Sequence, residues 1–202
     1  GESSPGLEVM EKTKKVKKFE VDLGFPKIGL MVDLGGGVAM YPYPGVDFRA
    51  GGDFTLGVSY RFAHGVDNGL GVGLRLDIRS LKLTTDTRDY SAIMAHILAV
   101  PAYQIRVHEI LGLEFSLPVG VAILSATEDV PTNERVDLLR GYLTSNGLAM
   151  FELGVAIGLR IRIVSALYAV IEPLRFHLLV PFAQWRPALV DMDILVRIGF
   201  EF

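Results

Sequence analysis

Apolar residues occupy every second position along most of the chain after residue 27. In segment 28–40 the even positions are mostly Ile, Leu and Val, whereas the odd positions are Gly, Ala, Met and one acid, Asp33. A period of two places these sets on opposite faces of a β-strand. The alternation recurs in seven further segments: 54–62, 70–78, 91–107, 111–123, 151–161, 166–182 and 190–202. The pattern therefore predicts an all-β protein with eight strands.

Two of the eight segments alternate less regularly than the others. The first half of 91–107 could instead form a short helix that begins at Ser91, and Pro101 interrupts the segment. In 166–182, Glu172 falls on the apolar face. We therefore expect a β-bulge near Pro173, because proline cannot donate to a ladder and is found at bulges and edges.

The connections between the predicted strands alternate in length. Segments 63–68, 108–110 and 164–165 are short, whereas the intervening segments are longer: 41–51, 84–90, 125–146 and 183–189. Transmembrane β-barrels have short periplasmic turns and longer extracellular loops. The rhythm predicts an antiparallel up-and-down transmembrane β-barrel of this kind.

The less apolar face consists of Gly, Ala and Ser, interrupted by single charges of both signs. A surface in water has no need for glycine, which weakens strands. A narrow eight-stranded barrel does need small residues, because its interior has room for few long side chains. We therefore expect the small face to line the lumen, where opposite charges pair. The predicted lumen charge network comprises Asp33, Arg75, Asp77, Arg79, Glu114, Glu152, Arg160, Arg162, Asp193 and Arg197.

The large apolar face is then expected to contact lipid. Lysine beyond residue 27 is confined to Lys82, near a predicted loop. Aromatic residues cluster toward the strand ends, as expected for girdles at the two membrane interfaces. The predicted girdle residues are Tyr41, Tyr43, Phe48, Phe54, Phe62, Tyr90, Tyr168, Phe182, Trp185, Phe200 and Phe202.

Composition narrows the classes of protein further. Half of the 202 residues are apolar, 21% are charged, and there is no cysteine. Such a chain can bury enough surface to fold, and it can form neither a disulfide scaffold nor a cysteine zinc site. A membrane-spanning helix needs about 18 consecutive apolar residues, which the sequence does not contain. The net charge of −3 gives no overall attraction to nucleic acid, so we expect no nucleic-acid partner.

The final strand carries the most specific resemblance. Its apolar residues Val196, Ile198, Phe200 and Phe202 run to an aromatic terminus and resemble the C-terminal signal of bacterial outer-membrane barrels. With eight strands, residues 28–202 resemble the small OmpA-like, OmpX-like and OmpW-like barrels. The resemblance implies location in the bacterial outer membrane, with both termini in the periplasm. It also implies contact with outer-membrane lipid, lipopolysaccharide and the barrel assembly machinery.

Residues 1–27 differ from the barrel and are expected to form a lysine-rich periplasmic tail. The lysine cluster comprises Lys12, Lys14, Lys15, Lys17 and Lys18. The alternating Phe19, Val21, Leu23 and Phe25 could extend the first strand backwards. We expect no signal peptide within these residues, and the opening Gly-Glu-Ser-Ser-Pro resembles the start of a mature chain.

Candidate chemistry is sparse. The histidines are His64, His96, His108 and His177. His177 is not followed by serine two residues later, so it departs from the His-x-Ser pattern of lipid A deacylases, and we interpret it as a hydrogen-bonding residue of the lumen. No histidine pair has metal-ligand spacing, and the glycine-rich segments precede no helix that could cradle phosphate. We expect no catalytic residue, cofactor or metal site.

Four functions remain open at this stage. The first is a non-enzymatic envelope anchor or interaction subunit with a lumen filled by side chains, whose partners bind loop 125–146 or the tail. The second is a porin-like channel for small or apolar solutes, and the third is a lipid-modifying enzyme. The fourth is a soluble ligand-binding barrel with its apolar face inside.

Overall fold

The computed structural model is all-β. It describes residues 29–41, 47–49, 51–62, 68–84, 89–127, 148–164, 166–182 and 188–202. The predictions for the lysine-rich tail, for strand extension by residues 19–25 and for most of loop 125–146 lie outside these residues. The described part contains no helix long and apolar enough to cross a membrane.

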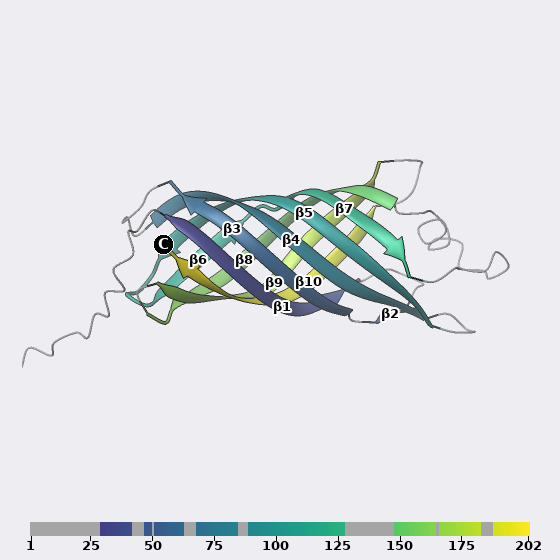
Figure 1. The fold of residues 1–202 in the computed structure, drawn as a ribbon, viewed down its shortest axis with the longest axis horizontal. Helices are drawn as coiled ribbons and strands as arrows, with labels where there is room; N and C mark the ends of the chain where they lie inside the picture. The colour runs from purple at the N-terminus through teal and green to yellow at the C-terminus, as the bar shows by residue number, and fades with distance from the viewer. Residues whose placement is uncertain are drawn as a thin grey trace, which may run out of the picture.

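Ten strands run through the described part of the chain (Figure 1). They are β1 (Leu30–Met40), β2 (Asp47–Arg49), β3 (Gly51–Arg61), β4 (Asn68–Thr84), β5 (Asp89–Arg106), β6 (Leu111–Ser116), β7 (Val119–Ala126), β8 (Leu148–Arg162), β9 (Leu167–Pro181) and β10 (Leu189–Glu201).

The sheet closes on itself into an antiparallel barrel with eight strand positions. β1 pairs with β10 from Met31↔Glu201 to Met40↔Met192, which joins the first strand to the last. β6 and β7 share one position, because both lie between β5 and β8. The short β2 pairs with the end of β4 next to β3. The predicted eight-stranded up-and-down barrel is confirmed.

The two ends of the barrel differ, and we name them by the described residues found there. Gly29 and Phe202 mark the terminal end, where the Gly29 N–H donates to the Phe202 carbonyl at 3.0 Å. Met40, where β1 ends, and Leu189, where β10 begins, mark the distal end. It lies opposite the end labelled C in Figure 1. Only residues 85–88 separate β4 from β5 at the distal end, because the two strands stay paired out to Thr84↔Asp89. This connection is therefore shorter than the segment 84–90 that we predicted.

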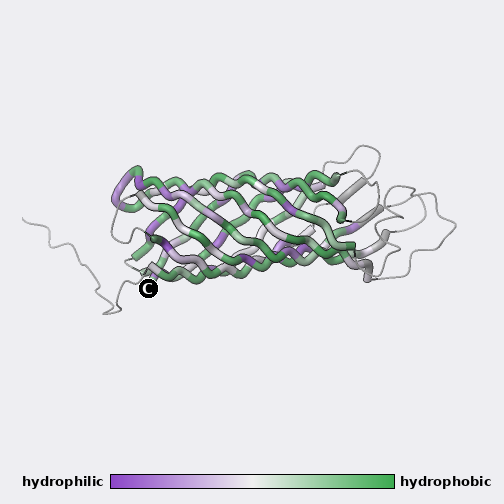
Figure 2. The backbone as a smooth tube through the Cα atoms, turned by 90° about the horizontal axis from the view of Figure 1, so that it is seen from above, coloured by the Kyte–Doolittle hydropathy of each residue, from purple (hydrophilic) through white to green (hydrophobic). Residues whose placement is uncertain are grey.

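Side chains alternate between the lumen and the outside of the wall. Hydrophobic and hydrophilic residues accordingly follow one another along the strands (Figure 2). In β4, Leu70, Leu74 and Ile78 face outward and are 41–69% exposed, whereas Asp77 and Arg79 face the lumen and are fully buried. The same alternation holds in every long strand, with the apolar set outside. The soluble alternative, with the apolar face inside, is therefore wrong.

Proline marks the irregular places in the wall. β5 is continuous through Pro101, so the short helix considered from Ser91 is wrong. The Pro101 carbonyl accepts the Leu117 N–H at 3.0 Å, so the missing Pro101 N–H faces the gap between β6 and β7.

The bulge expected near Pro173 is confirmed, because the β9–β10 register shifts between Arg175↔Asp193 and Glu172↔Leu195. The shift turns Glu172 into the lumen, where it is 1% exposed.

Two predicted girdle aromatics instead point inward. Tyr41 and Tyr168 are 5% and 3% exposed. Tyr168 is held in the lumen by its hydroxyl, which donates to Asp33 at 3.3 Å, and by the Arg160 guanidinium, which lies 3.7 Å above its ring. We predicted both tyrosines at the membrane interface because they lie near strand ends. The alternation instead places both side chains on the inner face.

Gly199 of β10 makes room for this tyrosine. A Cβ at Gly199 would lie 2.5 Å from Tyr168 Oη and 2.7 Å from Asp33 Cβ. We expect Gly199→Ala to lower the free energy of unfolding by about 1–3 kcal/mol, because the overpacked ring must leave its partners. Gly36→Ala is the matched control, since a Cβ on this outward-facing glycine meets nothing nearer than 3.4 Å. Urea unfolding of both variants in detergent micelles measures the difference, and equal effects would contradict the assigned packing.

Candidate functional site: the charged lumen

The interior of the barrel is a column of ion pairs. Six arginines and eight carboxylates with buried side chains face it, together with two histidines. The arginines are Arg61, Arg75, Arg79, Arg160, Arg175 and Arg197, and the acids are Asp33, Asp53, Asp77, Glu114, Glu152, Glu172, Asp191 and Asp193. The column therefore carries an excess of acid even before the half-buried Glu201 at the terminal end is included.

At the terminal end, Glu201 bridges two arginines. One of its oxygens lies 3.2 Å from Arg61 Nη1, and the other lies 3.2 Å from Arg160 Nη2. Arg61 also donates to Gln104, whose amide donates to Glu114 at 2.8 Å. Glu201 comes from the last strand, so this cluster fixes the closing strand against β3, β5 and β8.

One level deeper, Arg197 is shared by three acids. It donates to Asp33 at 2.9 Å, to Glu114 at 2.6 Å and to Glu172 at 2.7 Å. The acids come from β1, β6 and β9, so one guanidinium connects strands around the whole wall. A buried charge needs partners of this quality to offset its desolvation.

Arg175 and Arg79 form the centre of the column. Arg175 lies 2.6 Å from Asp77, 3.2 Å from Asp193, 3.5 Å from Glu172 and 3.7 Å from Asp53. Arg79 pairs with Asp53 at 3.2 Å and with Asp193 at 2.6 Å, and it also contacts Asp191. The Thr55 hydroxyl completes the centre by donating to Asp77 at 2.5 Å.

Beyond the arginines, Glu152 lies between two histidines. Its oxygens lie 2.6 Å from His96 Nδ1 and 2.5 Å from His177 Nδ1. His177 Nε2 is in turn 3.4 Å from Arg79 Nη2. His177 therefore makes hydrogen bonds inside the lumen, which is the role we inferred for it from its strand position.

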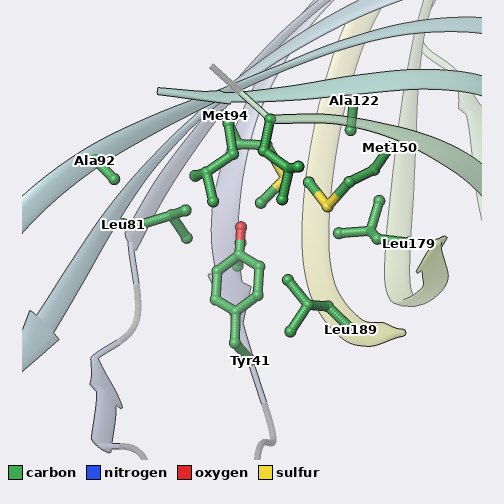
Figure 3. Packing of buried hydrophobic residues seen from close by; sticks show 11 residues of the cluster. Tyr41, Leu81, Ala92, Met94, Ala122, Met150, Leu179 and Leu189 are labelled. Carbon is green, nitrogen blue, oxygen red and sulfur yellow. The ribbon is translucent and has the colours of Figure 1, made fainter. Parts of the chain in front are cut away.

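An apolar cap closes the lumen at the distal end. Figure 3 shows Tyr41 between Leu81 and Leu189, with its hydroxyl toward Met94 and Met150. The cap is a continuous cluster of Ala39, Tyr41, Leu81, Ala92, Met94, Ala122, Leu124, Leu148, Met150, Leu179 and Leu189. Met150 and Leu179 are fully buried. The distal part of the described lumen is therefore packed with apolar side chains of the wall rather than with ion pairs.

All the predicted network residues except Arg162 are buried in the lumen. Arg162 is the last residue of β8, at the terminal end of the barrel, and its side chain is exposed. Our prediction that it belongs to the network is wrong.

The sequence reasoning also missed several members of the column. They are Asp53, Arg61, His96, Glu172, Arg175 and Asp191. For Arg61, Arg175 and Asp191 the alternation already gave the inner face. Asp53 was missed because β3 begins at Gly51, before the strand start that we predicted. Glu172 needed the bulge to be placed.

The predicted C-terminal signal lies in β10 and beside it. Val196, Ile198 and Phe200 face outward and are 45–51% exposed. The Phe202 N–H donates to the Leu30 carbonyl at 2.8 Å. Across the described residues, no group of three His, Asp or Glu side chains is arranged to hold a metal ion.

Comparison with known proteins points to the fold. No protein-family model matches the sequence, and no curated protein matches it. Neisserial surface protein A superposes with a TM-score of 0.51 and 10% identity, over 86% of this chain and 96% of that one. Ail of Yersinia pestis, in complex with a heparin analogue, gives 0.50 and 14% over 86% and 97%. The chain therefore has the eight-stranded barrel fold of these small bacterial surface and outer-membrane proteins.

Proposed function

We propose that the chain is an integral protein of the bacterial outer membrane, a non-enzymatic anchor or interaction subunit whose lumen is filled by side chains. The observation that carries the proposal is the distribution of polarity across the wall. Apolar side chains cover the outside in every long strand, and the ion pairs lie inside.

The outer belt has the chemistry of a lipid-facing surface. Among outward-facing strand residues whose side chains the structure describes, Lys82 is the only charged one, and it lies near the distal end of β4. A soluble monomer rarely exposes an apolar patch larger than a few hundred Å², so a continuous belt around the molecule needs a covering. Strands of about 9–11 residues suffice to cross a bilayer when tilted, and the long strands reach that length.

The filled lumen argues against the porin-like alternative. Reconstituted into planar bilayers, the protein is expected to give no stable open-channel current, because side chains fill the interior of an eight-stranded barrel, here as the ion-pair column and the apolar cap. The matched variant is Met150→Ser with Leu179→Ser, which makes the cap polar but leaves the ion pairs in place and is also expected to remain closed. A stepwise single-channel current from the unaltered protein would contradict the filled-lumen proposal.

The arrangement of the histidines supports the absence of enzymatic activity. His96 and His177 are fully buried, and both are engaged by Glu152. A general base must reach the proton it abstracts on a substrate, and the apolar cap separates this pair from the distal surface. Mass spectrometry of lipid A from cells with and without the protein tests the proposal, and a protein-dependent change in acylation would contradict it.

For its topology and partners we propose the arrangement implied by the resemblance. The terminal end faces the periplasm, the belt contacts outer-membrane lipid and lipopolysaccharide, and the barrel assembly machinery inserts the chain. Envelope partners bind the lysine-rich tail or loop 125–146. Both described ends of the chain, Gly29 and Phe202, lie at the terminal end, which is consistent with this topology.

The partner proposal is tested by co-purification in mild detergent. A partner of the tail should be lost when residues 1–27 are removed, and also when Lys12, Lys14, Lys15, Lys17 and Lys18 are changed to Gln. The barrel itself should remain folded in both variants. If the same proteins co-purify with the unaltered chain and with both variants, the tail does not bind them.

A further inference from the structure

The terminal half of the lumen contains a cavity that the ion pairs do not fill. Its volume is about 30 Å³. About 10–15 Å³ is enough for one water, so the space suits a small ion or a few waters. Gly57, Gly71, Gly73 and Ala102 form one wall, from β3, β4 and β5. The larger side chains of the lumen face them across the space.

The cavity lies toward the terminal end of the barrel. Ser59, Gly71, Ala102 and Gln104 line it and are partly exposed, whereas Gly57, Gly73 and Arg75, deeper along β3 and β4, are buried. Arg61 and Gly69, which lie nearer the terminal end, are buried as well. The partly exposed lining residues mark the part of the cavity that solvent reaches.

The lining is rich in unused hydrogen-bond donors. Four arginines line the cavity against two carboxylates, Asp33 and Glu114. Arg61 Nε, Arg75 Nη1 and Arg197 Nε are buried and have no hydrogen-bond partner among the described residues, and Asp33 Oδ1 is the one lining oxygen in that state. Leaving a buried donor unpaired costs about 1–3 kcal/mol.

Arg75 is the least compensated of these arginines. It is 5% exposed, and within the described part of the chain its one ion pair is to Glu172 at 3.5 Å. Glu172 is already shared with Arg197 at 2.7 Å and Arg175 at 3.5 Å. Arg75 Nη1 therefore remains a buried donor with no hydrogen-bond partner among the described residues, and a further acceptor in the cavity would satisfy it.

We propose that this cavity binds a small monovalent inorganic anion such as chloride, held by Arg61, Arg75 and Arg197. An anion only accepts hydrogen bonds, so it matches a lining in which free donors outnumber free acceptors. Water also donates two hydrogens, for which the lining offers few acceptors. The small residues of β3, β4 and β5 provide the space, and the partly exposed Ser59, Gly71 and Gln104 mark the side on which solvent reaches it.

Halide-dependent unfolding tests the proposal in solution. A ligand that binds only the folded state raises stability with concentration. The unfolding midpoint of the full chain in detergent should rise as chloride replaces sulfate at constant ionic strength, and bromide should act as chloride does. Ala102→Leu fills the pocket without changing charge and should abolish the halide response, as should Arg75→Gln. The exposed Arg162→Gln is the matched control and should keep it.

Bromide diffraction locates the ion without any variant. Crystals of the unaltered protein grown in sodium bromide should show an anomalous peak within hydrogen-bonding distance of Arg75, and crystals of Ala102→Leu should lack it. Water density with no bromide peak in the unaltered protein would overturn the proposal. A halide response that is unchanged in Ala102→Leu would overturn it as well.

Discussion

Replacing Arg175 by methionine should lower the free energy of unfolding by about 3–5 kcal/mol, the cost of leaving buried charges without their partner. Arg175 lies within 3.7 Å of four carboxylates, Asp53, Asp77, Glu172 and Asp193, and all four are buried. Methionine is unbranched and uncharged, so it keeps the apolar stem of the side chain while removing the guanidinium. Urea unfolding in detergent micelles, followed by circular dichroism, measures the change.

Arg162→Met is the matched control for this variant. It removes the same charge from β8, but the side chain is exposed, so stability should change by about 0.5 kcal/mol or less. Adding Asp77→Asn to Arg175→Met should recover part of the loss, because it removes one unpaired buried charge. If Arg175→Met unfolds no more easily than Arg162→Met, the column is not a paired network.

Replacing Leu74 by arginine should cost about 2–4 kcal/mol, the penalty for this charge at the middle of a lipid-facing barrel surface. Leu74 is 69% exposed and faces outward midway along the apolar residues of β4. In water, the same change would place a charge on a solvated surface and cost almost nothing. Unfolding in phospholipid vesicles measures the penalty.

Val107→Arg is the control for depth. Val107 is 65% exposed and follows β5 at the terminal end. The cost near the interface should be only about 0–1 kcal/mol. A depth-dependent cost supports a lipid-facing belt, whereas two equally small costs would place the belt in water.

The alternation of apolar and small residues predicted most of the fold, because successive side chains of a β-strand point to opposite faces of the barrel wall. Period two fixes which face each side chain takes, and the contrast between Leu or Val and Gly or Ala then fixes which face is inside. The strand pairings followed from the short and long connections, since neighbours in an up-and-down barrel are neighbours in the chain. A three-residue strand such as β2 is too short to have a period, and it was not predicted.

The predictions that failed did so where a local feature overrides the period. The period of two predicts that Glu172 faces outward. The bulge near Pro173 shifts the register, so the side chain faces the lumen instead. Arg162 lies at a position that should face inward, but it is the last residue of β8 and its side chain is exposed. Tyr168 lies near a strand end, yet inside the barrel its hydroxyl donates a hydrogen bond to Asp33 and its ring contacts the Arg160 guanidinium.

The sequence also did not predict which acids pair with which arginines inside the column. Alternation shows that Arg197 faces inward, but its three acids come from β1, β6 and β9. Their meeting depends on the strand stagger of the closed barrel, which is set by all the registers together. The excess of acid, the apolar cap and the terminal cavity appear only once those registers are known.

Electrophoretic mobility of unheated and boiled samples most directly tests whether the chain folds as a membrane-spanning barrel. After reconstitution into phospholipid vesicles, the unheated protein should keep its closed sheet in sodium dodecyl sulfate and migrate apart from the boiled form. Leu74→Arg should weaken the unheated band, whereas Val107→Arg should keep it. Identical mobility before and after boiling, together with a protein that stays soluble without detergent, would contradict the account.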